Sequence, residues 1–465
     1  MKTLLKNCRC FHYMNEQPVT AIVNIEIENG KISNILPIEK EISATYDRVI
    51  DCVGMEVYPG GIDPHVHLSA GSFTYVKGAG QVSADSYKTG SLAAIAGGTT
   101  TIMDFAFSQF ETDTAKDIIQ HRLDVVKADG CFVDYAFHIA LTQPSHVSLV
   151  AQGSTIEESF KIFTVYRGIK IDDSRDLFAI MKEIGANGKI AMIHCENEQV
   201  IAQNIRKLED MAMMSEVRPE WNELESTSRV LTIAEIIGCD VHIAHVSLPD
   251  AVRIINVYKK RYNSRQITCE VTGHHLHVTS DEYKYSLFKE DLVMSPPLQS
   301  EAAVKGMQKM LIDNQIDMAI SDHCPYTRSQ RWGAEKPFQI NHLDKQYYEM
   351  PAGTNGIQVR FIAAYSVLKA ANVSQEQIAK QLSQNAADRF KLTGKGRIQV
   401  GYDADIVVVN PYVQTLWSMD QLKENMDGSL FDGMKFRGKI ENVFAKGRQV
   451  GVDELEQGKY LRNFQ

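Results

Sequence analysis

The sequence predicts an α/β fold, a TIM-type (β/α)8 barrel with a small β-sandwich domain formed by both ends of the chain. Three observations predict this architecture. Strand-like and helical segments alternate through the middle of the chain, short strands dominate both ends, and histidines recur where the middle strands end. Regular alternation of strands and helices indicates a parallel sheet with helical crossovers, and 465 residues suffice for a barrel and a smaller domain.

The two ends of the chain share a pattern of short antiparallel strands. Near the start, Asn29-Gly30 separates two β-prone runs, which is a strong hairpin signal. Near the end, the turn-rich Gly401–Asp405 leads into the apolar run Ile406–Val409. We therefore assign the small domain to residues 1–55 and 396–465, and the barrel to residues 56–395.

The middle of the chain contains eight strand candidates, the number that a TIM-type barrel requires. They are Glu56–His67, Thr99–Ala106, Val133–Leu141, Phe160–Arg167, Lys189–Glu196, Val241–Ser247, Ile267–His277 and Ile316–His323. Helical patterns between them include Ser86–Ala96, Thr114–Ala128, Arg175–Ile184 and Ser226–Ile237. In such barrels the chemistry lies at the carboxyl ends of the strands. The longer connections 197–225 and 324–355 are candidate lids over that face.

Composition and charge exclude several classes of function. The net charge of −9 and the absence of a basic stripe argue against a nucleic-acid partner. No apolar run approaches the roughly 20 residues of a membrane span, and the apolar run at the N-terminus breaks too early for a signal peptide. The eight cysteines show no paired spacing and are expected to be reduced thiols, so we predict a cytoplasmic protein.

The segment Pro59–Leu68 is the most informative motif of the chain, because it contains His65 and His67. Side chains two residues apart on a strand point to the same side, so both imidazoles can reach one metal ion. The glycines and prolines before the pair would fix the turn that places it. A second pair, His275 and His277, lacks this approach and is expected to be structural.

Further metal-ligand types stand at the ends of later strands. The fifth strand ends in His194, the sixth in His245 and the eighth in Asp322. Each alone has a structural explanation, but together with His65 and His67 they predict one metal site at the barrel mouth. His242, three residues before His245, is expected to face the opposite side of its strand and to pack outward.

Lys161 on the fourth strand has two interpretations. Two ions about 3.5–4 Å apart need a bridging anion, and a lysine that has added carbon dioxide becomes a carbamate with two such oxygens. Spacing alone does not reveal this modification. From the residues alone, a salt-bridged barrel lysine is the better interpretation.

Over nearly its whole length the chain resembles the dihydropyrimidinase/hydantoinase branch of the metal-dependent amidohydrolase superfamily. The resemblance rests on motifs spread through both predicted domains. They are Pro59–Leu68, Gly97–Thr101, Ser159–Tyr166, Met192–Asn197, His245–Ser247, Met294–Leu298, Ser321–Pro325, Asn355-Gly356 and Gly401–Val408.

The resemblance implies a two-metal hydrolase of cyclic amides such as hydantoins or dihydropyrimidines, with zinc favoured and manganese or cobalt as alternatives. It implies that Lys161 is the carboxylated lysine and that the other ligands are His65, His67, His194, His245 and Asp322. Asp322 would also carry the proton. Tyr166 would polarise the scissile carbonyl, and main-chain groups of Ser295 and Asn355 would hold the ring amide. His323 would lie behind the ligands. A homotetramer or dimer is implied, with the segment after Val452 as a candidate intersubunit arm.

Some features depart from the family pattern and leave the substrate open. Cys269–Leu276 is closer to the dihydroorotase pattern, yet the arginine that dihydroorotases carry after the first histidine pair is replaced by Ser69 and Ala70. Gln358 stands where many hydantoinases have glutamate, and Met211–Glu225 departs from the usual loop.

The alternatives are an allantoinase, a dihydroorotase, a non-catalytic scaffold relative and a zinc-binding protein.

Four aromatic residues near the ends of the first strands are available either as pocket wall or as core. They are Phe73, Tyr75, Phe105 and Phe107.

Overall fold

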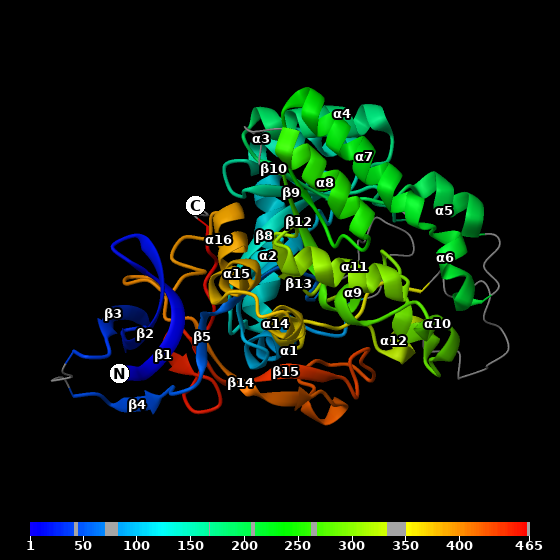
Figure 1. Ribbon diagram of the computed structural model, residues 1–465. Coiled ribbons are helices and arrows are strands. Elements are labelled where there is room, and N and C mark those ends of the chain that lie inside the picture. The colour runs from blue at the N-terminus through cyan, green and yellow to red at the C-terminus, as the bar shows by residue number, and fades with distance from the viewer. Residues whose placement is uncertain are drawn as a thin grey trace.

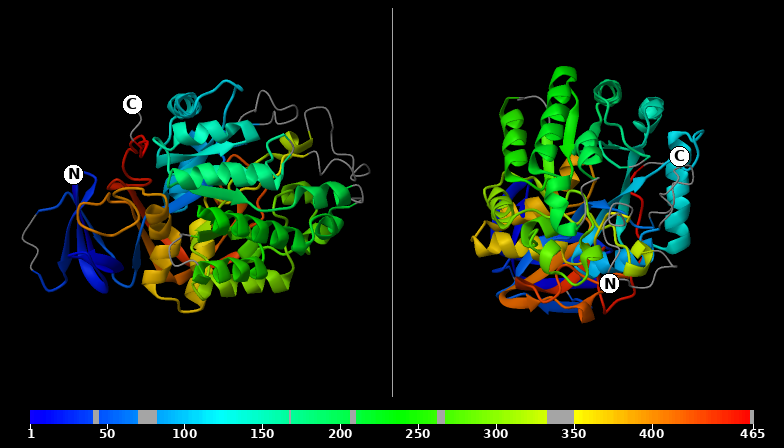
Figure 2. Two further views of the ribbon diagram at one scale, coloured as in Figure 1. Left: turned by 90° about the horizontal axis from the view of Figure 1, so that it is seen from above. Right: turned by 90° about the vertical axis from the view of Figure 1, so that its right-hand side faces the viewer.

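The computed structural model contains a parallel eight-stranded barrel with a mixed eight-stranded sheet on one side of it (Figure 1). It describes residues 1–40, 45–69, 82–166, 168–205, 210–261, 267–332 and 350–462. The helices surround the barrel strands, and in the view from above the N-terminal strands stand apart from this helical ring (Figure 2). The predicted fold class is confirmed.

The eight barrel strands are hydrogen-bonded in the order β13-β12-β11-β10-β9-β8-β7-β6, all parallel. They are β6 (Gly61–Val66), β7 (Thr99–Ala106), β8 (Asp134–Leu141), β9 (Ser159–Phe163), β10 (Ile190–His194), β11 (Asp240–Ile243), β12 (Ile267–Thr272) and β13 (Met318–Ile320). The first and last strands meet where the main-chain N–H of His67 donates to the carbonyl of His323 at 2.8 Å, which closes the barrel.

The strands differ from their predicted ranges mainly at the ends. The predicted strand Glu56–His67 is two strands, because β5 (Glu56–Pro59) pairs with β1 and β14 of the terminal sheet before Gly60. A Cβ at Gly60 would lie 2.1 Å from the Thr100 side chain, so only glycine allows this close crossing. The seventh strand was predicted to extend to His277, but it ends at Thr272. The short helix α9 (Gly273–His277) begins there and carries the second histidine pair.

The longer helices pack an apolar face on the barrel, as their sequence periodicity predicts. In α4, Leu177, Ile180, Met181 and Ile184 are buried, and the Asp173 side chain caps the helix by accepting from two main-chain N–H groups. The helices are α1 (Tyr87–Ala96), α2 (Ala115–Asp129), α3 (Val147–Gly153), α4 (Ser174–Ala186), α5 (Glu198–Asn204), α6 (Met214–Val217), α7 (Glu220–Ile237), α8 (Pro249–Arg261), α9, α10 (Glu282–Tyr285), α11 (Glu301–Ile312), α12 (Arg328–Trp332), α14 (Arg360–Ala370), α15 (Gln375–Ala379) and α16 (Asn385–Arg389). Short 3₁₀ or π segments are Pro144–His146, Met211–Met213, Lys289–Leu292, Lys380–Gln384 and Met419–Gln421.

Both candidate lids contain helix. The connection 197–225 holds α5, α6 and the start of α7, and the part of 324–355 that the structure describes holds α12. The helices α5, α6 and α12 lie on the side of the barrel away from β1–β4 (Figures 1 and 2). Among the described residues, no helix has both the length and the apolar character that crossing a membrane requires.

The two ends of the chain form one mixed sheet with the strand order β16-β15-β14-β5-β1-β2-β3, to which β4 adds beside β1. Its strands are β1 (Lys2–Met14), β2 (Gln17–Glu28), β3 (Lys31–Pro37), β4 (Arg48–Asp51), β5, β14 (Ile406–Leu416), β15 (Lys435–Ala445) and β16 (Arg448–Gln449). Blue N-terminal and orange-to-red C-terminal strands therefore lie together in Figure 1. Because β5 belongs to this sheet, the chain changes its strand-pairing partners from the terminal sheet to the barrel at Gly60. The predicted domain bounds, residues 1–55 with 396–465 and residues 56–395, stay a prediction.

A buried lysine joins the terminal sheet to the barrel. Lys395 is 1% exposed, and its Nζ lies 2.6 Å from Asp134, 2.7 Å from Asp405 and 2.9 Å from Asp403. Burial alone would lower the pKa of Lys395, but the three carboxylates raise it above its ordinary value. The ammonium group therefore pairs with three carboxylates at this junction, of which Asp134 and Asp405 are buried and Asp403 is partly exposed.

Replacing Lys395 with methionine is expected to lower the free energy of unfolding by about 3–5 kcal/mol, because among the described ion pairs it leaves buried Asp405 without a counter-ion. Asp134 keeps Lys446 at 3.2 Å, and Asp403 keeps Lys31 at 2.6 Å. Denaturant unfolding of the apoprotein measures the change. The control is Lys439→Met, which removes a half-exposed lysine paired with Glu441 at 3.0 Å and should cost less than about 1 kcal/mol. Equal losses in the two variants would contradict the prediction.

The C-terminal segment packs against its own barrel as far as the structure describes it. The main-chain N–H of Tyr135 on β8 donates to the carbonyl of Lys459 at 3.0 Å, and its carbonyl accepts from the main-chain N–H of Leu461 at 2.8 Å. The Tyr460 hydroxyl donates to buried Glu157 at 2.5 Å. Up to Arg462, the candidate arm is thus bound within its own chain, and residues 463–465 lie outside the described residues.

Candidate metal centre

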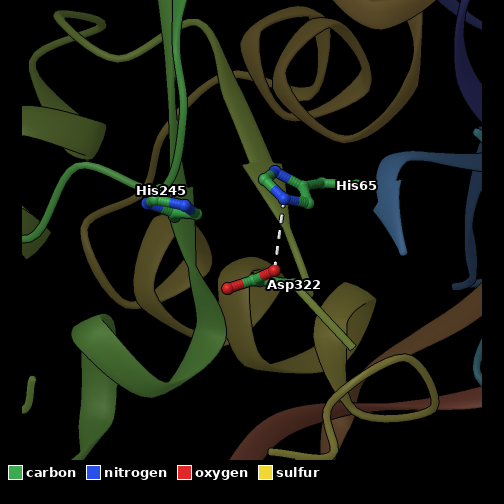
Figure 3. Close-up of side chains that lie close together, drawn as sticks. All are labelled: His65, His245 and Asp322. Carbon is green, nitrogen blue, oxygen red and sulfur yellow. Dashed lines mark ion pairs between the residues drawn. The ribbon is translucent and has the colours of Figure 1, made fainter. Parts of the chain in front are cut away.

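Three of the predicted ligands converge at the mouth of the barrel (Figure 3). One ligand atom each of His65, His245 and Asp322 lies within 4.8 Å of the others. The Asp322 carboxylate is 3.2 Å from His65 Nε2 and 3.3 Å from His67 Nε2, so the first and last barrel strands bring three donors together.

The other predicted ligands adjoin this group. His194 Nδ1 and His245 Nε2 face each other at 2.9 Å, and Lys161 Nζ is 3.5 Å from His65 Nε2. All six predicted ligand residues therefore gather at one place, and among them only His67 and Asp322 keep more than a few per cent of side-chain exposure.

Lys161 is fully buried, and its ammonium group lacks a close counter-ion. Its Nζ lies 5.0 Å from the ring centroid of Phe105 and 5.1 Å from that of Phe163. Among the described residues it forms no ion pair, which disfavours the salt-bridged interpretation. Burial lowers the pKa of Lys161 to about 8, against the opposing influence of Glu270 and Asp322.

Three of the predicted site residues have left-handed backbone conformations just after their strands. The φ angles are +31° at His245, +50° at Asp322 and +101° at Tyr166. Such conformations are unfavourable for non-glycine residues and cluster at functional sites, where the surrounding structure holds them. The turn at each position breaks the alternation of side chains along the strand and directs the side chain toward the mouth of the barrel.

This turn also explains why the prediction for His242 is wrong. His242 is fully buried and packs edge-on against Phe390, which lies in the apolar layer that fills the lower barrel. Strand alternation ends at Ile243, and the positive φ of His245 rotates its side chain inward. His242 and His245 therefore both point into the barrel, at different depths.

Glu270 on β12 is a site residue that the sequence reasoning missed. Its carboxylate accepts from His65 Nδ1, from His242 Nε2 at 2.9 Å and from the main-chain N–H of His245 at 3.2 Å. The bond to Nδ1 leaves the lone pair of His65 on Nε2, which faces Asp322. Burial raises the pKa of Glu270 to about 8, with Lys161 opposing the shift. The sequence signal that could have identified Glu270 was a charged residue within an otherwise apolar strand.

Glu196 has the same role for His194. Its Oε2 lies 2.8 Å from His194 Nε2, so the lone pair of that ring is on Nδ1, the atom that faces His245. Arg218 donates to the same oxygen at 2.5 Å. Burial acts to raise the pKa of Glu196, but Arg218 and the bond to His194 lower it overall.

The remaining predicted residues lie near the ligands, with different partners. The ring of Tyr166 is 5.1 Å from that of His194, and the Ser295 side chain interacts with its hydroxyl. Burial raises the pKa of Tyr166, so the phenol keeps its proton at neutral pH. Asn355 donates to Glu424 at 2.6 Å, while the His323 ring pairs with Asp85 at 3.0 Å, and its place behind the ligands stays a prediction.

Of the four aromatic residues named for the pocket, two are described. Phe105 is fully buried and stacks on His67 with ring centroids 4.6 Å apart, so it forms part of the wall beneath the ligands. Phe107 stacks on Phe163 at 6.0 Å. Phe73 and Tyr75 lie outside the described residues.

The donor set fits divalent metal ions. Four imidazoles and a carboxylate converge, and the two oriented rings turn their unprotonated nitrogens toward the shared space. A nitrogen and oxygen donor set of this kind suits zinc, manganese or cobalt.

Comparison with known proteins agrees with this geometry. The model of the amidohydrolase family matches residues 57–450. This chain belongs to the amidohydrolase family. The amidohydrolase resemblance drawn from the sequence motifs is thereby confirmed, and the family supports a metal-dependent enzyme.

Individual relatives place the chain more closely within the amidohydrolases. The D-hydantoinase of Streptomyces coelicolor is 27% identical over 451 residues, covering 94% of this chain and 92% of that protein. An allantoinase of Escherichia coli is 27% identical over 460 residues, covering 94% of this chain and 92% of that protein. The crystal structure of dihydropyrimidinase from Brevibacillus agri superposes with a TM-score of 0.85 at 26% identity, covering 99% of this chain and 98% of that one.

Proposed function

We propose that this protein is a metal-dependent hydrolase that opens the amide bond of cyclic ureides such as hydantoins and 5,6-dihydropyrimidines to N-carbamoyl amino acids. The observation that carries the proposal is the convergence of His65, His245 and Asp322 at the barrel mouth. Relatives named D-hydantoinase and dihydropyrimidinase, matched over nearly the whole chain, support the substrate class.

In this proposal two groups of donors would each hold one divalent ion. His65, His67 and Asp322 form one group, and His194 with His245 forms the other. Lys161, as N6-carboxylysine, would supply oxygens to both groups from its place beside His65. When bound, the ions supply Lewis-acid polarisation of the ring carbonyl and acidify the attacking water.

The side chains of the site supply the remaining chemistry. The Tyr166 hydroxyl donates a hydrogen bond to the carbonyl oxygen as negative charge develops there, a contribution worth about 3–4 kcal/mol per donor. Water adds to the carbonyl carbon, and Asp322 takes its proton. The ring C–N bond then breaks as Asp322 returns the proton to the leaving nitrogen. Main-chain groups of Ser295 and Asn355 would hold the ring amide.

Several finer features are part of the proposal. Zinc is the expected metal, with manganese or cobalt as substitutes that the same donors accept. We further infer a cytoplasmic homo-oligomer, a tetramer or a dimer, that acts on small molecules and binds neither nucleic acid nor membrane.

A substrate panel with defined metal tests the activity. The purified protein, loaded with zinc, manganese or cobalt, is incubated with hydantoin, dihydrouracil, allantoin and dihydroorotate, and ring opening is followed by ultraviolet absorbance and product NMR. We expect turnover of hydantoin or dihydrouracil, loss of activity after chelation and recovery when metal returns. A metal-loaded protein that opens none of these rings would contradict the proposed function.

Allantoinase is the second candidate, because the Escherichia coli allantoinase matches as large a share of the chain as the D-hydantoinase does. Preferential turnover of allantoin in the same panel would select it. A dihydroorotase is less favoured, since Ser69 and Ala70 stand where that pattern has arginine.

A further inference from the structure

One histidine ring in each group of metal donors is oriented by its own carboxylate, His65 by Glu270 and His194 by Glu196. Of these two carboxylates, only Glu196 is held by residues between α6 and the first turn of α7. Residues Arg218–Glu223, here called the α6–α7 corner, contain the start of α7 and lie on the side of the barrel away from the N-terminal strands (Figure 1). The corner contacts the chain just after both β10 and β11.

On the β10 side, the corner holds Glu196 through both carboxylate oxygens. Arg218 donates to Oε2 at 2.5 Å, and Asn222 Nδ2 donates to Oε1 at 3.2 Å. Asn222 Oδ1 also accepts from the main-chain N–H of Asn197 at 2.6 Å. Because Glu196 Oε2 accepts from His194 Nε2, these bonds fix the direction in which His194 Nδ1 points.

On the β11 side, the corner holds the residues that follow His245. Glu223 accepts from the main-chain N–H of Ser247 at 3.0 Å and also from the Ser247 hydroxyl. His245 has a left-handed backbone conformation, which requires the surrounding structure to maintain it. Glu223 anchors the chain two residues beyond that turn.

The other donor group uses different supports. His65 is oriented by Glu270 on β12, and His67 stacks on Phe105 of β7. Glu270 does accept from the main-chain N–H of His245, but the described contacts of the corner include none with His65, His67 or Asp322.

We propose that the α6–α7 corner sets the affinity of the metal ion held by His194 and His245, independently of the ion held by His65, His67 and Asp322. Arg218 and Asn222 act as positioning residues through Glu196. The inference rests on the two-ion site proposed above. Removing a residue that orients a ligand in this way typically costs roughly 10–100-fold in metal affinity.

The test is metal content under increasing chelator, measured by elemental analysis on full-length protein loaded with Zn²⁺ alone. Arg218→Met keeps the length of the side chain and removes its charge, and Arg218→Lys keeps the charge with a single donor group. We expect the wild type to hold two ions, Arg218→Met to release one ion at roughly 10–100-fold less chelator, and Arg218→Lys to fall between them. The release of the second ion should be unchanged.

The matched control is Arg48→Met, which breaks a partly buried arginine pair with Asp453 at 2.8 Å in the terminal sheet and should retain both ions. The inference is overturned if Arg218→Met releases both ions at the same chelator concentrations as the wild type. It is also overturned if the variant loses affinity for both ions to the same extent. If that variant does not fold, Asn222→Ala should show the same selective shift to a smaller extent, and no shift would overturn the inference. A wild type that holds fewer than two ions overturns the two-ion proposal itself.

Discussion

Replacing Asp322 with asparagine is expected to lower kcat/KM for the ring substrate on the order of 10³-fold. The amide keeps the shape of the side chain but cannot accept the proton of the attacking water and return it to the leaving nitrogen. Asparagine also tolerates the left-handed backbone conformation, φ +50°, that Asp322 adopts, so the local fold should persist. Steady-state kinetics with metal supplied in excess measures the loss.

The control for this substitution lies at the other end of the same strand. Asp317 pairs with Lys259 and supports the main-chain N–H of Cys269 at 2.8 Å, away from the mouth. Asp317→Asn should change kcat/KM only slightly. Comparable losses in the two variants, or near-wild-type activity of Asp322→Asn, would contradict the proton-transfer role.

Replacing Lys161 with methionine is expected to remove the shared oxygen ligand, to reduce the bound metal to one ion at most and to lower kcat by roughly 10³-fold or more. Methionine fills similar space beside Phe105 and Phe163 but cannot form a carbamate. A metal contribution of several kcal/mol corresponds to such a factor, since each 1.4 kcal/mol is tenfold. Elemental analysis and kinetics measure the two effects.

Mass spectrometry of the intact protein adds an independent measure of the modification. The wild type, kept with bicarbonate and metal under native conditions, should be heavier by one carbon dioxide, and the methionine variant should not. Lys189→Met is the matched control, because Lys189 precedes β10 at the opposite end of the barrel and pairs with Glu158 at 2.9 Å. Two ions bound beside an unmodified Lys161 would contradict the carbamate.

The residues that orient the metal ligands could not be identified from local sequence patterns. Glu270 and Glu196 orient His65 and His194, yet neither has a spacing that marks it as part of a metal site. Each was visible only as a charged residue within or beside a buried strand. Arg218 was less visible still, since 22 residues separate it from Glu196.

The sequence by itself determined the alternation of strands and helices, the sheet at both ends and the positions of the ligand candidates. These properties follow from local rules, because strand periodicity and the burial of apolar residues act over a few neighbours. The bounds of β7 and the capped starts of α1 and α2 were accordingly well predicted.

The tertiary structure alone decided how those candidates face one another. The expectation for His242 failed because a single left-handed residue, His245, interrupts the alternation that the expectation assumed. The split at Gly60 likewise depends on a close approach to Thr100, 40 residues away. Contacts between distant segments override local preference at such points, and they place the metal donors and their supports.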